Sequence, residues 1–411
     1  MLSGFCWRRG LLNLWRVRLD LILRNGYLPG RRRPVDVGIR GGEIVEIAPR
    51  LNATAIREID VRDGLIAPGL VDGHMHLDKA LTADRVPGGA RGLLGLEDLK
   101  RAISASREIK RAFTVDDVRD RAITVARMSA CAGTVLLRTH VDVDPMVGLT
   151  GLKGVLEARK ACAPWIEIQI VAFPQEGILR APGTEDLLRQ ALELGADAIG
   201  GIPALDDDPK KHVDIVFALA KEFNRPIDMH VDESDRAEDF TLPYVLEKTE
   251  LEGLGGQVTV AHISSLAVLP DEIALPTIAR LASSGINVCV NPIIIKITRL
   301  RELLAAGVNV FFGSDNIRDP FYPLGNGNPL SNALLACQLT AMGSHEELAR
   351  AFDAVSGNAA QALGKRVYGL AEGSPADLVL FRASTAAEAI IDQLPPVAII
   401  RQGNLVQCHW H

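Results

Sequence analysis

Eight short β-rich segments alternate with helical segments through the middle of this 411-residue chain, and this alternation constrains the fold more than any other feature. The β-rich segments are residues 69–78, 133–144, 165–175, 197–205, 226–233, 257–265, 286–292 and 308–316. Segments between them, such as 115–133 and 184–196, carry apolar residues at helical spacing. Eight strands alternating with helices predict an α/β fold, the (β/α)₈ or TIM barrel. A doubly wound open sheet is the alternative, but it usually needs a Gly-rich phosphate turn after the first strand, and the sequence has none there.

The two ends of the chain have a different pattern. Residues 19–66 alternate apolar and polar side chains at period two, with a turn signal at Asn25-Gly26, and the C-terminal segment repeats this style around Gln402-Gly403. Chain ends often meet on the outside of a domain, so we expect both ends to form one small β-sandwich domain. The expected division is an N-terminal extension at 1–18, the β-domain at 19–66 and 367–408, and the barrel at 67–366.

Composition excludes several classes of protein. The chain is 47% hydrophobic and 23% charged, which is typical of a soluble globular protein, and its net charge of -6 argues against nucleic acid or an anionic membrane as a partner. Its longest apolar stretches are broken by charge, Gly or Pro, so no membrane span is expected. The six cysteines form no C-x-x-C pair and are predicted to be free thiols in a reducing, cytoplasmic environment.

Polar residues recur at the C-terminal ends of the predicted strands. These residues are His74, His76, His140, Asp142, Gln175, His230, Glu233, His262 and Asp315. In a barrel of this kind, the C-terminal ends of all strands form the face that carries the active site. Histidines scattered through a core would not keep choosing the same end of each strand, so the pattern predicts a catalytic site.

A metal site follows from the same residues. His74 and His76 are two positions apart in an extended strand, so their side chains share a face and both imidazoles reach one ion. An H-x-H is a weak signal alone, but His230 and Asp315 at later strand ends complete three nitrogens and one carboxylate oxygen. This set suits Zn²⁺ or Fe²⁺ and leaves a position for water. A bridging lysine of a two-metal site is absent from the tip of the fourth strand, so we expect one divalent ion.

The roles expected for the acids and the remaining histidines differ from one residue to the next. Glu233 would be an ordinary solvated residue in most loops, but beside a metal-bound water it can shuttle protons. His262 can stabilise charge on the attacking oxygen, and Asp315 can accept a proton from the water. His140 is expected to support the ligands or the fold. His212 and His345 lie in predicted helices and are expected at the surface.

The joint motifs resemble the amidohydrolase superfamily, and several segments are similar to bacterial cytosine deaminase. The telling segments are "APWIEIQIVAFPQEGIL", "IDMHVDESD", "VTVAHIS", "SGINVCVNP" and "DPFYPLGNGN". The resemblance runs from about residue 20 to 406 and implies a mononuclear site, in which His74, His76, His230 and Asp315 hold the metal. It also implies that Glu233 and His262 are catalytic, that Gln175 binds the ring, and that the enzyme is a homo-oligomer acting on a nucleobase-like small molecule.

Two departures from cytosine deaminase bear on the substrate. "SDN" at 314–316 replaces a motif that resembles "HDD", so a substrate-facing aspartate becomes Asn316. "HLDKA" with Lys79 is instead similar to N-isopropylammelide isopropylaminohydrolase, which lacks the glutamate that Glu233 supplies. We expect Gln175, Asn316 and Lys79 to contact the substrate, with Phe173 as an apolar wall. The predicted reaction is hydrolytic deamination of an aminated pyrimidine or related cyclic amidine. Its rivals are loss of an alkylamine from a triazine, hydrolysis of a cyclic amide, and a barrel that has lost its chemistry.

Overall fold

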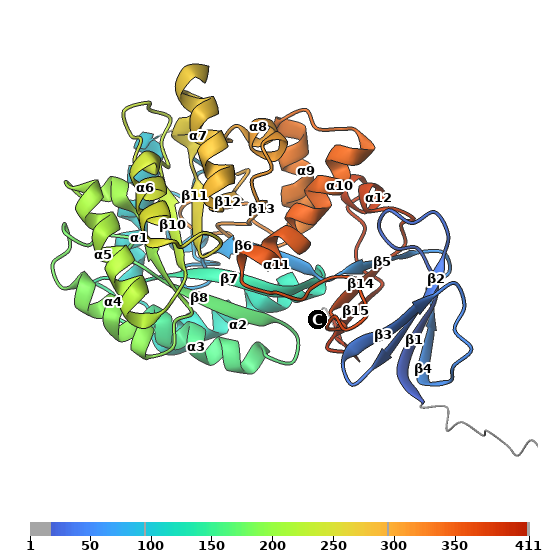
Figure 1. Ribbon diagram of the computed structural model, residues 1–411. Coiled ribbons are helices and arrows are strands. Elements are labelled where there is room, and N and C mark those ends of the chain that lie inside the picture. Colours follow the sequence, from blue (N-terminus) through green and yellow to red (C-terminus); the bar gives the residue numbers. More distant parts are fainter. Residues whose placement is uncertain (1–17, 94–95, 294–295, 409–411) are drawn as a thin grey trace, which may run out of the picture.

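A computed structural model describes residues 18–93, 96–293 and 296–408 of the chain (Figure 1). Its central sheet has eight parallel strands in the order β13-β12-β11-β10-β9-β8-β7-β6. They are β6 (Leu70–Met75), β7 (Thr134–Asp142), β8 (Glu167–Phe173), β9 (Ala198–Gly201), β10 (Ile227–Val231), β11 (Val258–His262), β12 (Asn287–Val290) and β13 (Val310–Phe312). A parallel bridge between Met75 and Asp315 joins the last strand to the first. The predicted (β/α)₈ barrel is therefore confirmed.

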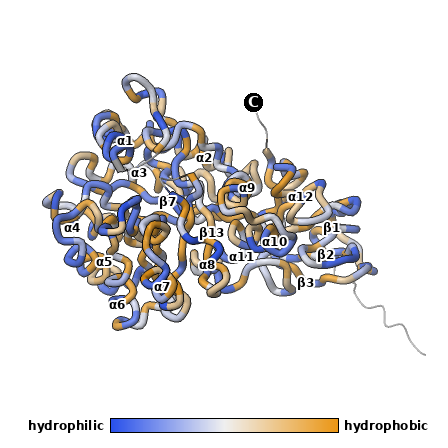
Figure 2. Tube along the Cα trace, turned by 90° about the horizontal axis from the view of Figure 1, so that it is seen from above, coloured by the Kyte–Doolittle hydropathy of each residue, from blue (hydrophilic) through white to orange (hydrophobic). Residues whose placement is uncertain are grey.

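Helices form a layer outside the barrel strands (Figure 1). They are α1 (Leu96–Lys110), α2 (Val115–Cys131), α3 (Thr150–Cys162), α4 (Thr184–Glu193), α5 (Pro209–Phe223), α6 (Leu242–Glu252), α7 (Asp271–Ser284), α8 (Leu300–Ala305), α9 (Pro329–Leu339), α10 (His345–Ala354), α11 (Gly357–Ala362) and α12 (Ala386–Ile391), with short 3₁₀ turns η1 (Ala83–Arg85), η2 (Pro203–Leu205) and η3 (Ser264–Ala267). Hydrophobic and hydrophilic residues alternate along most of these helices (Figure 2), because only one face of each packs on the barrel. Among the described residues, no helix combines the length and apolar character needed to cross a membrane.

Local sequence explains where these elements begin and what they bury. In α2, the side chain of Thr114 accepts a hydrogen bond from the backbone N–H of Asp117 and so caps the helix. Val118, Ala122 and Val125, at spacings of four and three, are fully buried against the barrel. The barrel strands are buried on both faces, which explains their nearly continuous runs of Val, Ile and Leu.

Two further sheets stand beside the barrel. The first contains β1 (Leu19–Gly26), β2 (Val35–Arg40), β3 (Glu43–Ala48) and β4 (Ala55–Asp60) in the order β3-β2-β1-β4. The second contains β5 (Leu65–Pro68), β14 (Leu378–Phe381), β15 (Ala398–Arg401) and β16 (Asn404–Leu405). Leu23, Ile66 and Leu378 belong to one apolar cluster, so both chain ends share a core, and the blue and red strands lie together in Figure 1.

The expected sandwich built from both chain ends is thus present as two packed sheets. The exact limits of the β-domain and barrel stay predictions. The N-terminal extension expected at 1–18 lies outside the described residues apart from Arg18. Cys6 also lies outside them, and the described cysteines are free thiols, as expected.

Candidate metal centre and active site

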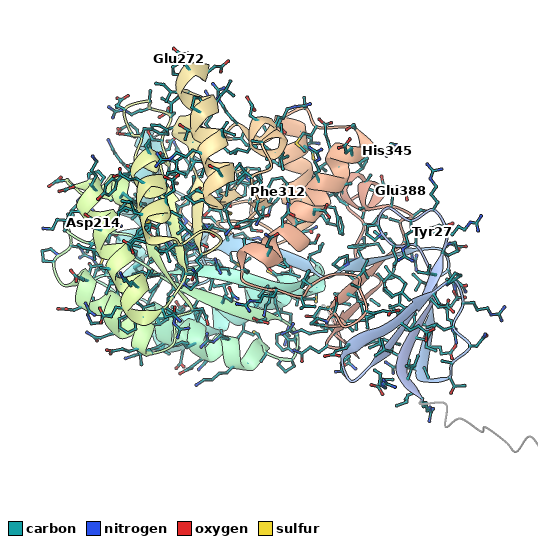
Figure 3. The ribbon with its side chains drawn as sticks, viewed as in Figure 1. Tyr27, Asp214, Glu272, Phe312, His345 and Glu388 are labelled. Carbon is teal, nitrogen blue, oxygen red and sulfur yellow. The ribbon has the colours of Figure 1, made fainter. Side chains whose placement is uncertain are left out.

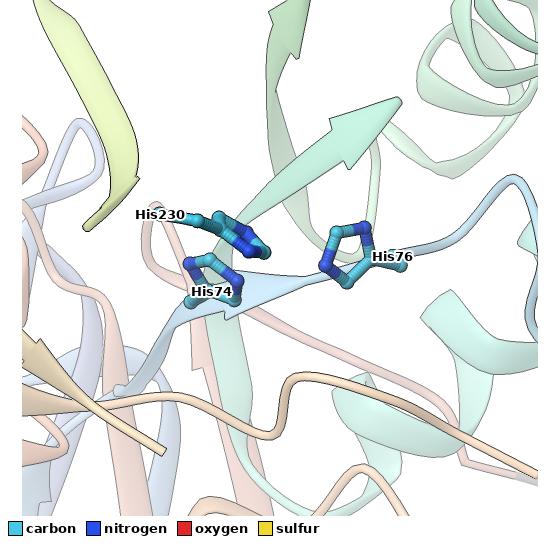
Figure 4. A group of neighbouring side chains, drawn as sticks. All are labelled: His74, His76 and His230. Carbon is cyan, nitrogen blue, oxygen red and sulfur yellow. The ribbon is translucent and has the colours of Figure 1, made fainter. Parts of the chain in front are cut away.

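Three histidines converge at the C-terminal ends of two barrel strands (Figure 4). His74 is in β6, His76 directly follows that strand, and His230 is in β10. Candidate ligand atoms of the three lie within 4.8 Å of one another, and all three side chains are buried. The ring centroids are 4.8 Å apart for His74 and His230, and 5.4 Å apart for His76 and His230. Residues more than 150 positions apart therefore form one cluster.

Asp315 reaches this cluster from the end of β13. Its Oδ1 lies 3.5 Å from His74 Nε2 and 3.3 Å from His76 Nε2. Backbone hydrogen bonds hold it there: the Asp315 N–H donates to the His74 carbonyl at 2.8 Å, and the His76 N–H donates to the Asp315 carbonyl at 3.0 Å. The closure of the barrel between β6 and β13 thus places the carboxylate beside both histidines.

The donor set fits a divalent metal ion. Within the described part of the chain, several buried ring nitrogens and one carboxylate oxygen of the cluster have no hydrogen-bond partner. These atoms are His74 Nδ1, His74 Nε2, His76 Nδ1, His230 Nε2 and Asp315 Oδ2. A buried polar atom without a partner costs about 1–3 kcal/mol. Nitrogens and a carboxylate oxygen that converge in this way are the ligands that Zn²⁺ and Fe²⁺ take.

The electrostatics of the cluster favour the protonation states in which these side chains bind a metal ion. Burial, with the charge of Lys79, holds the pKa of His76 well below its ordinary value, and burial with His262 does the same for His230. Burial alone would raise the pKa of Asp315, but the close approach of the His74 and His76 imidazoles holds it well below its ordinary value. Neutral imidazoles and an ionised carboxylate are the forms that bind a metal.

Glu233 and His262 lie against the third histidine. Glu233 Oε2 is 3.3 Å from His230 Nδ1 and 3.7 Å from His262 Nε2, and His262 Nε2 is 3.1 Å from His230 Nδ1. Burial, followed by the charge of Asp315, raises the pKa of Glu233 well above its ordinary value. The neighbouring Asp232 carboxylate accepts the backbone N–H groups of residues 241 and 242, which holds the loop that carries Glu233.

The residues expected to contact a substrate occupy the same end of the barrel. The Phe173 ring lies 4.3 Å from that of His230, between centroids. Lys79 Nζ donates to Gln175 Oε1 at 2.9 Å, so two of the expected residues touch each other. Asn316, directly after Asp315, donates from Nδ2 to Asp319 Oδ2 at 2.6 Å.

His140 packs against the histidine cluster through His74. Its ring centroid is 4.0 Å from that of His74, and its Nε2 is 3.3 Å from the carbonyl oxygen of Asp228. Burial lowers the pKa of His140 to about 4, so the ring is neutral at pH 7. Asp228 also pairs with Arg138 at 2.8 Å. This geometry matches the supporting position expected for His140.

Sequence reasoning missed a buried network of charges beside Lys79. Lys110 Nζ lies 2.8 Å from Asp142 Oδ2, 3.1 Å from Asp144 Oδ2 and 3.4 Å from Glu176 Oε1. The signal was present in "HVDVD", where two aspartates share one face after a buried strand and so need a buried cation. Lys110 itself was not identifiable, because it comes from α1, earlier in the chain.

The expectation that His212 lies at the surface is wrong. His212 is fully buried in α5. Its Nδ1 lies 2.6 Å from Asp206 Oδ2, and its Nε2 accepts the Ile202 N–H at 3.0 Å. His212 falls on the face of α5 that packs against β9, where its two nitrogens both find partners. His345 is exposed, as expected (Figure 3).

Comparisons with known proteins agree with this geometry. Residues 57–407 match the family described as the Amidohydrolase family. The chain is 32% identical to N-isopropylammelide isopropyl amidohydrolase of Pseudomonas sp. strain ADP, over 94% of this chain and 97% of that protein. It is 30% identical to pterin deaminase of Rhizobium rhizogenes, over 90% of this chain and 87% of that protein. The crystal structure of 5-methylcytosine deaminase from Klebsiella pneumoniae, liganded with 5-fluorocytosine, matches with a TM-score of 0.87 and 31% identity, over 95% of this chain and 98% of that one.

Proposed function

This chain belongs to the amidohydrolase family and is a hydrolase of C–N bonds, and we propose that it deaminates a cytosine-like aminated pyrimidine or a related cyclic amidine, releasing ammonia. One observation carries the proposal: a buried carboxyl, Glu233, lies 3.3 Å from His230 and 3.7 Å from His262. Deamination needs a group that moves a proton from water to the ring and to the leaving amine. A carboxyl beside the candidate metal ligands is suited to that task.

Each residue has a role in the proposed reaction. His74, His76, His230 and Asp315 would hold one divalent ion, Zn²⁺ or Fe²⁺, which when bound supplies a Lewis acid that lowers the pKa of a water molecule. Asp315 accepts a proton as the water attacks the amine-bearing carbon. Glu233 protonates the adjacent ring nitrogen, which keeps negative charge off the ring. As the C–N bond breaks, Glu233 takes the proton of the new hydroxyl group and delivers it to the departing amine, and the proton on Asp315 then returns to Glu233. His262 hydrogen-bonds the new hydroxyl group.

The remaining residues hold the ring. Phe173, whose ring lies 4.3 Å from that of His230, provides an apolar wall. Gln175 and Asn316 supply amide groups that hydrogen-bond the ring edge. A nucleobase-sized ring with polar edges is the small molecule that such a pocket accepts.

The test is Glu233→Gln in metal-loaded protein. We expect its metal content to equal that of the wild type and its kcat to fall about 10²–10⁴-fold, because the amide keeps the shape and loses the proton. Ammonia release is followed from cytosine, 5-methylcytosine, isocytosine, pterin, creatinine and aminotriazines. Glu238→Gln, an exposed glutamate in the same loop, is the matched control and keeps full activity. Full activity in Glu233→Gln refutes the assignment.

A second candidate is the release of an alkylamine from a triazine. It is favoured by the 32% identity with N-isopropylammelide isopropyl amidohydrolase and by Lys79 in "HLDKA". The two reactions differ in their product. Release of isopropylamine from N-isopropylammelide, with no ammonia from the other rings, supports the second candidate, and a ring-opened acid indicates a cyclic amide hydrolase.

A further inference from the structure

Lys79 and Gln175 form a contact that bears on which rings the pocket accepts. Lys79 is fully buried, and its Nζ donates to Gln175 Oε1 at 2.9 Å and to Asp142 Oδ1 at 2.7 Å. Gln175 is also nearly buried, at the C-terminal end of β8, two residues after Phe173. The lysine therefore contacts the side chain expected to bind the ring.

Lys79 is held firmly in this position. Asp142 accepts a hydrogen bond from Lys79 at Oδ1 and another from Lys110 at Oδ2, the latter at 2.8 Å. Its backbone N–H donates to Asp78 Oδ2 at 2.9 Å. Although burial lowers the pKa of Lys79, Asp142 and Asp78 raise it above its ordinary value overall, so the ammonium keeps its charge. Displacing Lys79 would leave a buried carboxylate with half of its partners, which is costly.

The ammonium decides how the amide of Gln175 is oriented. A lysine ammonium has three N–H donors and no acceptor, so only the oxygen of an amide can face it. The Nε2 hydrogens of Gln175 consequently point away from Lys79. No acceptor takes them within residues 18–93, 96–293 and 296–408, and Nε2 is not among the fully buried atoms that lack a partner. These hydrogens are free to meet a ligand.

We propose that Lys79 is a positioning residue that fixes the amide of Gln175 with its N–H groups toward the substrate. The pocket then selects rings that present a carbonyl oxygen or a nitrogen lone pair at this edge, and rejects rings that present an amino group there. A site built for one hydrogen-bonding partner discriminates strongly, because the wrong partner leaves buried polar groups unpaired. The inference rests on the proposed function only for the location of the substrate.

Equilibrium binding tests the inference without turnover. Cytosine carries a carbonyl oxygen where 2,4-diaminopyrimidine carries an amino group. Their Kd values are measured by titration calorimetry on Zn²⁺-loaded Glu233→Gln protein, which is expected to keep its metal and to turn over too slowly to consume the ring. In this background, we expect the protein with Lys79 intact to prefer cytosine by at least about tenfold. Adding Lys79→Met should reduce this ratio to about twofold, because the amide of Gln175 is then free to rotate. Equal Kd values for the two rings in the protein with Lys79 intact overturn the inference. If this preference is found and the wild type releases no ammonia from any ring, only the proposed deamination is overturned.

A double-mutant cycle separates positioning from direct contact. If Lys79 acts through Gln175, Lys79→Met leaves the Kd ratio unchanged in a Gln175→Leu background. If the two losses multiply instead, Lys79 contacts the ring itself and the inference is wrong. Lys153→Met, at an exposed position of α3, is the control and keeps the ratio of the protein with Lys79 intact.

Gln175→Glu keeps the test informative if Lys79→Met does not fold. The new carboxylate retains the bond to Lys79 and removes the N–H donors from the pocket. We expect the preference to reverse toward 2,4-diaminopyrimidine. A retained tenfold preference for cytosine in Gln175→Glu contradicts the inference.

Discussion

His212 binds the carboxylate of Asp206, which also holds the loop at residues 178–180. Asp206 accepts the backbone N–H groups of residues 178, 179 and 180, as well as the Nδ1–H of His212. We predict that His212→Leu destabilises the protein by about 2–4 kcal/mol, because the Ile202 N–H and Asp206 each lose a buried partner. Urea unfolding measures the change. His345→Leu, at the exposed start of α10, should lie within about 0.5 kcal/mol of the wild type, and equal effects of the two substitutions would contradict the assignment.

For single residues, a role can be predicted from the sequence when it depends on near neighbours in the chain. His74 and His76 were identifiable because a period of two puts both on one face of a strand. Lys110 and Asp206, the partner of His212, were not identifiable. Each contact joins a helix residue to a strand end or a loop whose position only the folded barrel determines. A histidine in an amphipathic helix has no local signal that says which face it occupies.

Among the elements, β6 and β13 meet so closely that a glycine is required. A Cβ placed on Gly313 would lie 2.5 Å from His74 Cβ and 2.8 Å from the His74 carbonyl oxygen. We predict that Gly313→Ala pushes these strands apart, costs about 1–3 kcal/mol, and weakens Zn²⁺ binding because Asp315 moves away from the histidines. Thermal unfolding and metal titration report the two effects. Gly343→Ala, where a Cβ would meet open space, is the control, and a Gly313→Ala protein with wild-type metal affinity would refute the argument.

Helix α2 anchors the loop that follows β6. Arg121 donates to the carbonyls of Asp78 and Ala80 at 2.8 and 2.7 Å, and Asp117 binds both Arg121 and Arg85. Burial alone would raise the pKa of Asp117, but the two arginines lower it to about 2 from 3.8. A depressed carboxyl pKa adds stability that is complete above the unfolded value and is lost as pH falls through the folded value.

Asp117→Asn should therefore have a pH-dependent effect on stability. We predict that the difference in unfolding free energy between wild type and variant is constant from pH 7 to about 4 and closes toward about 2, because both arginines stay charged throughout. Urea unfolding across this range measures it. Asp116→Asn, exposed on the same helix, is the control. A difference that does not change with pH would mean that the carboxylate charge contributes nothing.

For the molecule as a whole, the alternation of β-rich and helical segments predicted the barrel, and the β-rich chain ends predicted the sandwich. The eight strands were recognisable because each is a short apolar run between helical segments. How strands of the two ends pair was not predictable: β5 joins β14 through contacts more than 300 residues apart in the chain, such as Ile66 with Leu380. Pairing over such distances is set by packing of whole sheets rather than by any local pattern.

The metal site links residues that only the complete barrel brings together, so metal binding should stabilise the whole chain. His74, His230 and Asp315 come from β6, from β10 and from the end of β13, and an unfolded chain cannot assemble them. A ligand that binds only the folded state, at free concentrations about 1,000 times its Kd, adds about 4 kcal/mol. We predict that chelation lowers the Tm by about 5 °C and that Zn²⁺ restores it. His76→Ala lacks one candidate ligand, so its Tm should respond little to chelator or Zn²⁺. A wild-type Tm that ignores both would mean that the histidine cluster holds no metal.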